Sequence, residues 1–158
     1  MELTEPLTEP TRITRDPVPT VVVRHRGVRM DQLRDFFDAG FSALAASGAV
    51  LAGPAFAVYR GDLGATFDLD IGFPVAEPPA EPVAVAGLTL EASELPGGEW
   101  LGLTHLGSYD RLGESWGRLA QAADERELRG SAMLEVYVTE PSPEIDPDTL
   151  RTDLFLMA

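Results

Sequence analysis

Residues 131–141, "SAMLEVYVTEP", have the composition of a β-strand that runs into a turn. Val136 and Val138 are β-branched and Tyr137 is aromatic, and these residue types favour strands. Glu135 stands in the middle of this apolar run. It is either a solvated residue of an edge strand or the one charged group of a ligand pocket, because a carboxylate is rarely buried without a partner.

The chain repeats itself around this strand. Each half is expected to contain a strand, a helix and two further strands, and a histidine stands two residues before a glycine at the end of each first strand. Two βαββ units in tandem predict an α+β domain with pseudo-two-fold symmetry, a mostly antiparallel sheet, two helices and a central ligand cleft. The expected strands are 20–27, 54–61, 64–75, 83–96, 99–109, 132–139 and 150–158, and the expected helices are 30–47 and 110–128.

Both expected helices carry an apolar stripe at helical spacing, and the expected strand 64–75 alternates between apolar and polar residues. Its polar residues Asp68 and Asp70 form either a solvated face or an acidic rim that attracts cations. The stripes consist of Leu33, Phe37, Phe41 and Leu44 on the first helix, and of Leu112, Trp116, Leu119 and Ala123 on the second.

Alternation also divides the strand at 132–139 into two faces. One face carries Glu135 and Tyr137, and the other carries Leu134, Val136 and Val138. We expect the aliphatic face to pack on the helices, so that Glu135 points away from the core. The equivalent positions of the first half are Ala57 and Tyr59, so a site between the halves would hold one carboxylate and two tyrosines.

Length and composition predict one domain. Residues 1–17 are expected to be a flexible segment with a short strand, and residues 18–158 a single domain whose repeats span about 18–76 and 83–158. The Pro-rich stretch 76–82 connects the two repeats.

The formal net charge of −14 argues against nucleic-acid binding and against docking on an anionic membrane. The chain has no cysteine, no apolar run of membrane-spanning length and no signal peptide at its start, so we expect a cytoplasmic protein. Its two histidines, His25 and His105, have no clustered third ligand, and we expect neither a metal site nor a cofactor.

Three stretches together resemble the GyrI-like small-molecule-binding family, which includes gyrase-inhibitory proteins and the effector-binding domains of some AraC-type and MerR-type regulators. The stretches are "FDLDIGFPV" (67–75), "LPGGEWLGLTHLGSYDRLGESWGRL" (95–119) and "LEVYVTEP" (134–141), within a match from about residue 18 to the end. Ser108 departs from the Gly-Pro-Tyr that the family usually shows at 107–109, whereas Gly107 and Tyr109 match it.

The resemblance implies a cleft around a buried glutamate, Glu135, ringed by aromatic side chains. We expect Tyr137, Tyr109, Trp116, Tyr59 and Phe73 to line this cleft with it. Core packing is the alternative for Trp116 and Phe73, and a helix cap is the alternative for Tyr109. Trp100 is expected in the core.

These observations favour a stand-alone protein that binds an aromatic or amphipathic small molecule around Glu135, cationic molecules included. One alternative, implied by some family members, is a hydrolase that opens cyclopropane rings, with Glu135 directing a water and Tyr109 donating to a carbonyl. A second alternative is a module that inhibits gyrase through its surface. The protein is expected to be a monomer or homodimer.

Overall fold

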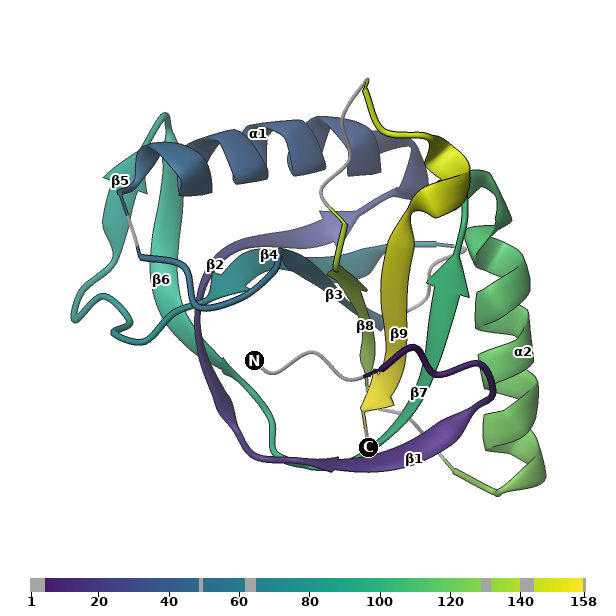
Figure 1. The fold of residues 1–158 in the computed structure, drawn as a ribbon. Coiled ribbons are helices and arrows are strands. Elements are labelled where there is room, and N and C mark those ends of the chain that lie inside the picture. The colour runs from purple at the N-terminus through teal and green to yellow at the C-terminus, as the bar shows by residue number, and fades with distance from the viewer. Residues whose placement is uncertain (1–4, 49, 62–64, 129–131, 140–143, 158) are drawn as a thin grey trace.

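The computed structural model describes residues 5–48, 50–61, 65–128, 132–139 and 144–157, and there the chain forms a nine-stranded antiparallel sheet with two α-helices (Figure 1). The helices are α1 (Leu33–Ala46) and α2 (Leu112–Glu125), and each follows a short 3-10 turn. The strands are β1 (Thr11–Arg15), β2 (Val18–Val28), β3 (Phe56–Gly61), β4 (Phe67–Pro74), β5 (Val83–Val85), β6 (Leu88–Leu95), β7 (Gly98–Leu106), β8 (Ala132–Tyr137) and β9 (Arg151–Met157). Neither helix has the length and apolar character that crossing a membrane requires, and no other described helix does.

The order of the strands confirms the predicted α+β fold with two repeats. The sheet runs β1-β7-β9-β8-β3-β4-β2-β6-β5, so the order β2-β4-β3 of the first repeat is mirrored by β7-β9-β8 of the second. The two repeats meet where β3 pairs with β8, with Ala57 opposite Glu135. This pair therefore lies next to the pseudo-two-fold axis.

One expected strand is two strands. The stretch 83–96 was expected to be continuous, but β5 and β6 form a hairpin in which Val85 pairs with Leu88. The two residues between them, Ala86 and Gly87, have φ angles of 52° and 80°. Two consecutive positive φ angles are typical of a tight two-residue hairpin turn whose twist matches that of the strands.

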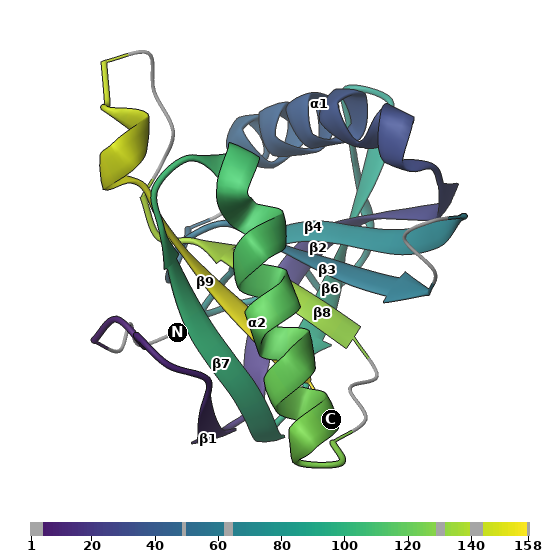
Figure 2. The ribbon, with the colours of Figure 1, turned by 90° about the vertical axis from the view of Figure 1, so that its right-hand side faces the viewer.

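Each helix covers the strands of its own repeat (Figures 1 and 2). The apolar stripe of α1 packs on a cluster formed by β2, β3, β4 and β6, and that of α2 packs on β7 and β9. Met133 and Tyr137 of β8 belong to the α1 cluster. Both helices therefore lie on the face of the sheet to which Glu135 points.

The expectation that the aliphatic face of β8 packs on the helices is wrong. Leu134 and Val136 are buried on the opposite face, in a cluster whose buried residues come from strands β2, β3, β6, β7, β8 and β9. The sheet curls, so that Trp100 of β7 joins this cluster together with Val22 of β2. Because the curled sheet supplies its own apolar interior, the helices are left to cover the outer face, where Glu135 lies.

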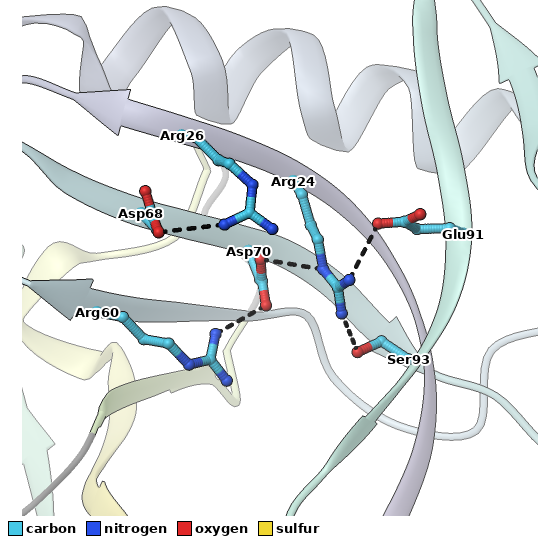
Figure 3. A network of polar contacts seen from close by, with 7 residues as sticks. All are labelled: Arg24, Arg26, Arg60, Asp68, Asp70, Glu91 and Ser93. Carbon is cyan, nitrogen blue, oxygen red and sulfur yellow. Dashed lines mark hydrogen bonds and ion pairs between the residues drawn. The ribbon is translucent and has the colours of Figure 1, made fainter.

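Asp68 and Asp70 are neither simply solvated nor a free acidic rim, because arginines pair with both (Figure 3). Asp70 forms salt bridges with Arg60 and Arg24, with nitrogen–oxygen distances of 2.9 Å and 3.5 Å. Asp68 forms one with Arg26 at 3.3 Å. Arg24 also reaches Glu91 and Ser93 of β6. The network joins β2, β3, β4 and β6 by polar contacts.

Candidate functional site

The carboxylate of Glu135 lies at the centre of β8 and is only 5% exposed. Three side chains donate hydrogen bonds to it, each at 2.8 Å. The hydroxyls of Tyr59 and Tyr137 donate to Oε1, and the indole Nε1 of Trp116 donates to Oε2. A buried carboxylate requires such partners, and this one receives them from three different elements.

The fold explains why these four side chains meet. Tyr137 follows Glu135 by two residues and therefore projects from the same face of β8. Tyr59 lies on β3, two residues from Ala57, which pairs with Glu135, so its side chain is a diagonal cross-strand neighbour. Trp116 belongs to the apolar stripe of α2, which packs on that same face of the sheet.

All three donors are neutral groups. In the described part of the chain no arginine or histidine pairs with Glu135, and its partners are the two phenols and the indole. The site thus provides hydrogen bonds to both oxygens but no opposite charge. A buried carboxylate arranged in this way favours a ligand that brings a positive charge.

The tyrosines around Glu135 are held in their neutral form. Burial raises the pKa of Tyr59 and of Tyr137 well above the ordinary value of 10.0, and the nearby negative charge of Glu135 raises both further. The pKa of Tyr109 is also raised, again by burial first and by Glu135 second. These hydroxyls therefore remain hydrogen-bond donors over the whole physiological range.

A chain of aromatic rings extends from Glu135 towards solvent. The ring of Tyr137 makes edge contacts with Phe37 at 6.1 Å, Phe41 at 6.3 Å and Tyr109 at 6.2 Å between centroids. Tyr109 is 37% exposed, and Phe37 and Phe41 are partly buried. The carboxylate thus lies beneath aromatic side chains from α1, from β8 and from the 3-10 turn that precedes α2.

The structure brings the predicted site residues together to different degrees. Tyr59, Tyr137 and Trp116 contact Glu135 directly, whereas Tyr109 is one ring away. Phe73 is two rings away, because it contacts Phe41 at 6.0 Å, which in turn contacts Tyr137.

The contribution of α1 to these surroundings was not predicted. Phe37 and Phe41 were assigned to a core stripe, and they do pack on the core while also contacting Tyr137. The available signal was that three phenylalanines, Phe36 among them, lie within six positions of one helix stripe. An aliphatic stripe would be the commoner way to fill a core.

The remaining candidates lie elsewhere. Trp100 is 2% exposed in the inner core, as predicted. His25 stacks on Phe36 at 4.2 Å, and burial lowers its pKa. His105 hydrogen-bonds the Ser115 hydroxyl and the Ser108 carbonyl. Among the described residues no three metal-binding side chains gather closely enough to hold an ion.

Comparison with solved structures shows the same fold in several proteins. The EcmrR C-terminal domain has a TM-score of 0.73 at 14% identity, over 96% of this chain and 97% of that one. A hydrolase from Listeria innocua has a TM-score of 0.64 at 15% identity, over 96% and 92%. SAV2435, in a structure bound to tetraphenylphosphonium, has a TM-score of 0.66 at 8% identity, over 94% and 93%. These low identities show a shared fold alone.

Sequence comparison gives the family. No curated protein matches the chain, but the family profile of the GyrI-like small molecule binding domain matches residues 61–158. The match includes β4 to β9 and α2, and with them Glu135, Tyr137 and Trp116. Because it spans more than half of the sequence and agrees with the fold, the chain belongs to the GyrI-like small molecule binding domain family.

Proposed function

We propose that this protein binds a small aromatic or amphipathic organic cation in a cleft around Glu135, between the two repeats. The observation that carries the proposal is a carboxylate, 5% exposed, with three neutral donors and no positively charged partner among the described residues. A ligand cation would supply the missing opposite charge.

The aromatic surroundings support the same class of ligand. The faces and edges of Tyr109, Tyr137, Phe37 and Phe41 offer apolar area, and ring faces attract cations in addition. Family membership supports small-molecule binding in general. The structural relative SAV2435 is bound to tetraphenylphosphonium, a bulky aromatic cation, and this suggests a first probe.

The proposal is tested by titrating the protein with tetraphenylphosphonium and following tryptophan fluorescence. Trp116 lies at the site and Trp100 is buried in the inner core, so Trp116→Phe identifies which indole responds. Glu135→Gln should weaken binding by about 30-fold or more, since an unpaired ligand charge costs about 2 kcal/mol or more. Neutral triphenylphosphine oxide should bind wild type and Glu135→Gln about equally.

Asp68→Asn is the matched control, because it also removes one carboxylate charge but lies on the opposite face of the sheet. It should leave the affinity for tetraphenylphosphonium within about twofold, since exposed charges act weakly at a distance. Equal affinity of wild type and Glu135→Gln for the cation would refute the proposal.

One observation favours the hydrolase as a second candidate. The Tyr109 hydroxyl makes no hydrogen bond within the described residues, and Tyr109 is partly exposed beside Tyr137. It could donate to a carbonyl conjugated with a cyclopropane ring while Glu135 directs a water. The water oxygen would then bond to a ring carbon, the ring C–C bond would break with its electron pair passing to the carbonyl oxygen, and the water proton would pass to Glu135.

Incubation with a cyclopropane-bearing duocarmycin-type compound tests this candidate. Ring-opened product in molar excess over the protein indicates turnover, and Glu135→Gln should abolish it. Product no faster than in buffer would eliminate the hydrolase and leave the binder. Inhibition of gyrase stays a prediction, to be checked by a supercoiling assay with added protein.

A further inference from the structure

An open pocket of about 370 Å³ lies at the edge of the sheet, and its lining includes neither Glu135 nor the three donors of Glu135. One wall is the N-terminal segment, one is the end of β7 and one is the first half of α2. In Figure 1 the N-terminal segment runs beside α2 before it turns back into β1. The lining residues are Pro6, Thr8, Thr104, His105, Leu106, Arg111, Glu114, Ser115 and Arg118.

Arg118 in α2 and Arg126 at the C-terminal end of α2 hold the N-terminal segment in place. Arg118 donates to the carbonyl of Thr8, and Arg126 donates to the carbonyl of Pro10. Leu7 adds two hydrogen bonds with Thr104 of β7. The wall that this segment gives to the pocket is therefore tied to both β7 and α2.

Arg111 and Glu114 are exposed to solvent, and they differ from Arg118 and Arg126 because their side chains have no protein partner among the described residues. Neither the guanidinium nor the carboxylate makes a hydrogen bond or ion pair with any residue in the described ranges. Arg111 ends the 3-10 turn before α2, Glu114 lies in the first turn of α2, and both line the pocket. The pocket thus presents a positive and a negative group.

The hydrogen bonds of His105 determine whether the Ser115 hydroxyl can donate or accept a hydrogen bond in the pocket. A carbonyl oxygen only accepts, so the contact of His105 Nε2 with Ser108 O at 2.8 Å requires a proton on Nε2. In the neutral ring Nδ1 then accepts, and the Ser115 hydroxyl donates to it at 2.7 Å. The lone pairs of the Ser115 oxygen remain as an acceptor, as do the oxygens of Glu114.

We propose that this pocket is a second ligand site, which binds a small zwitterion such as a free α-amino acid. Its carboxylate would pair with Arg111, whose planar guanidinium suits bidentate contact. Its ammonium group would donate to Glu114 and to Ser115. The volume lies at the lower end of the range of small-molecule sites, which fits a ligand of this size.

The test uses L-phenylalanine as the probe and the amide NMR signals of Leu106, Glu114 and Ser115 as the readout. Saturable shifts should appear with wild type, and Arg111→Ala should weaken binding at least tenfold. L-phenylalaninamide, which lacks the carboxylate, and 3-phenylpropionate, which lacks the ammonium group, should each bind at least tenfold more weakly. Arg34→Ala, which removes an exposed arginine of α1, should change nothing.

The proposal would be overturned if these amides showed no saturable shift, or if wild type and Arg111→Ala bound L-phenylalanine equally well. It would also be overturned if wild type bound inorganic phosphate as tightly as L-phenylalanine. Ser115 precedes Trp116, which contacts Glu135, so the shifts of Leu106 and Glu114 are the ones that separate this pocket from the Glu135 site. Glu135→Gln should bind L-phenylalanine like wild type, and tetraphenylphosphonium should not compete with it.

Discussion

Among the described residues, three carboxylates of this sheet are buried, and two of them have arginine partners whereas the third has none. Asp70 and Asp153 are 8% and 4% exposed and occupy equivalent positions in the repeats, since Asp70 pairs with Val58 and Asp153 with Val136. Each is held by arginine. Arg24 and Arg60 reach Asp70 (Figure 3), and Arg151 contacts Asp153 at 3.0 Å through both Nε and Nη2.

Glu135 lies on the opposite face of the same sheet and has no such partner. Its equivalent in the first repeat is Ala57, so the repeats agree at the paired aspartates and differ at the position of the glutamate. A charge that the fold neutralises by itself contributes to structure. Under the proposed function, a charge that the fold surrounds only with neutral donors is left for a ligand, and this contrast leads to four predictions.

The largest effect on stability is expected at Asp153. Asp153→Asn removes the charge that faces Arg151, whose side chain is only 17% exposed, and Thr104 keeps an acceptor in the amide oxygen. Breaking a buried ion pair costs about 3 kcal/mol or more. Urea denaturation should show a loss of about 3 kcal/mol, and the exposed control Asp148→Asn should show almost none. A loss below about 1 kcal/mol would mean that Asp153 is not a structural charge.

The second prediction concerns alkaline pH, because the tyrosine donors of Glu135 can lose their protons there whereas arginine cannot. The folded pKa values of Tyr59 and Tyr137 are raised above 10.0, so the folded state keeps these protons after the unfolded state has lost them. Their contribution to stability is therefore complete below pH 10 and is lost as pH rises above it. The slope should reach about 1.4 kcal/mol per pH unit for each tyrosine.

Denaturation at several pH values between 9 and 11.5 measures this slope, and Tyr59→Phe should make it shallower. The chain has three tyrosines, and the pKa of each is raised. Tyrosinate absorbance of the folded protein should therefore show no ordinary step at pH 10, while the unfolded protein should show one. A full step in the folded protein would contradict the buried site.

The fold was predictable because local sequence patterns indicate its repeat. The two histidine–glycine pairs, the two apolar helix stripes and the tyrosines after each helix indicated two βαββ units, and the sheet order confirms them. The hairpin turn at Ala86 and Gly87 was missed, because alternation of residues continues through a two-residue turn.

The site was predictable where contacts follow from a strand register and less so where they depend on packing. Tyr137 and Tyr59 follow from alternation and from the repeat, whereas Phe37 approaches Tyr137 only through the placement of α1. The side of the sheet that carries the helices was predicted wrongly. Alternation separates two faces, but the curl of the sheet decides which face becomes the inner core.

The third prediction is a smaller loss at Asp70 than at Asp153. The side chains of Arg24 and Arg60 are 37% and 44% exposed, so water can solvate them when their partner is removed. Asp70→Asn should therefore cost about 1–2 kcal/mol in urea denaturation, between the values for surface and buried pairs. High salt should reduce the difference from wild type, since partly exposed pairs are screened. A loss as large as that of Asp153→Asn would remove this distinction between the repeats.

The smallest effect on stability is expected at Glu135, although it is buried as deeply as Asp153. Glu135→Gln keeps one oxygen as an acceptor, and since the tyrosine hydroxyls can rotate, the amide nitrogen can donate to one of them. The variant also removes a buried charge that lacks an opposite charge, which offsets the altered hydrogen bonds. The free energy of unfolding should change by less than about 1 kcal/mol, in contrast to Asp153→Asn. A loss of about 3 kcal/mol would make Glu135 a structural carboxylate like the aspartates, and a site reserved for a cation would no longer follow from its surroundings.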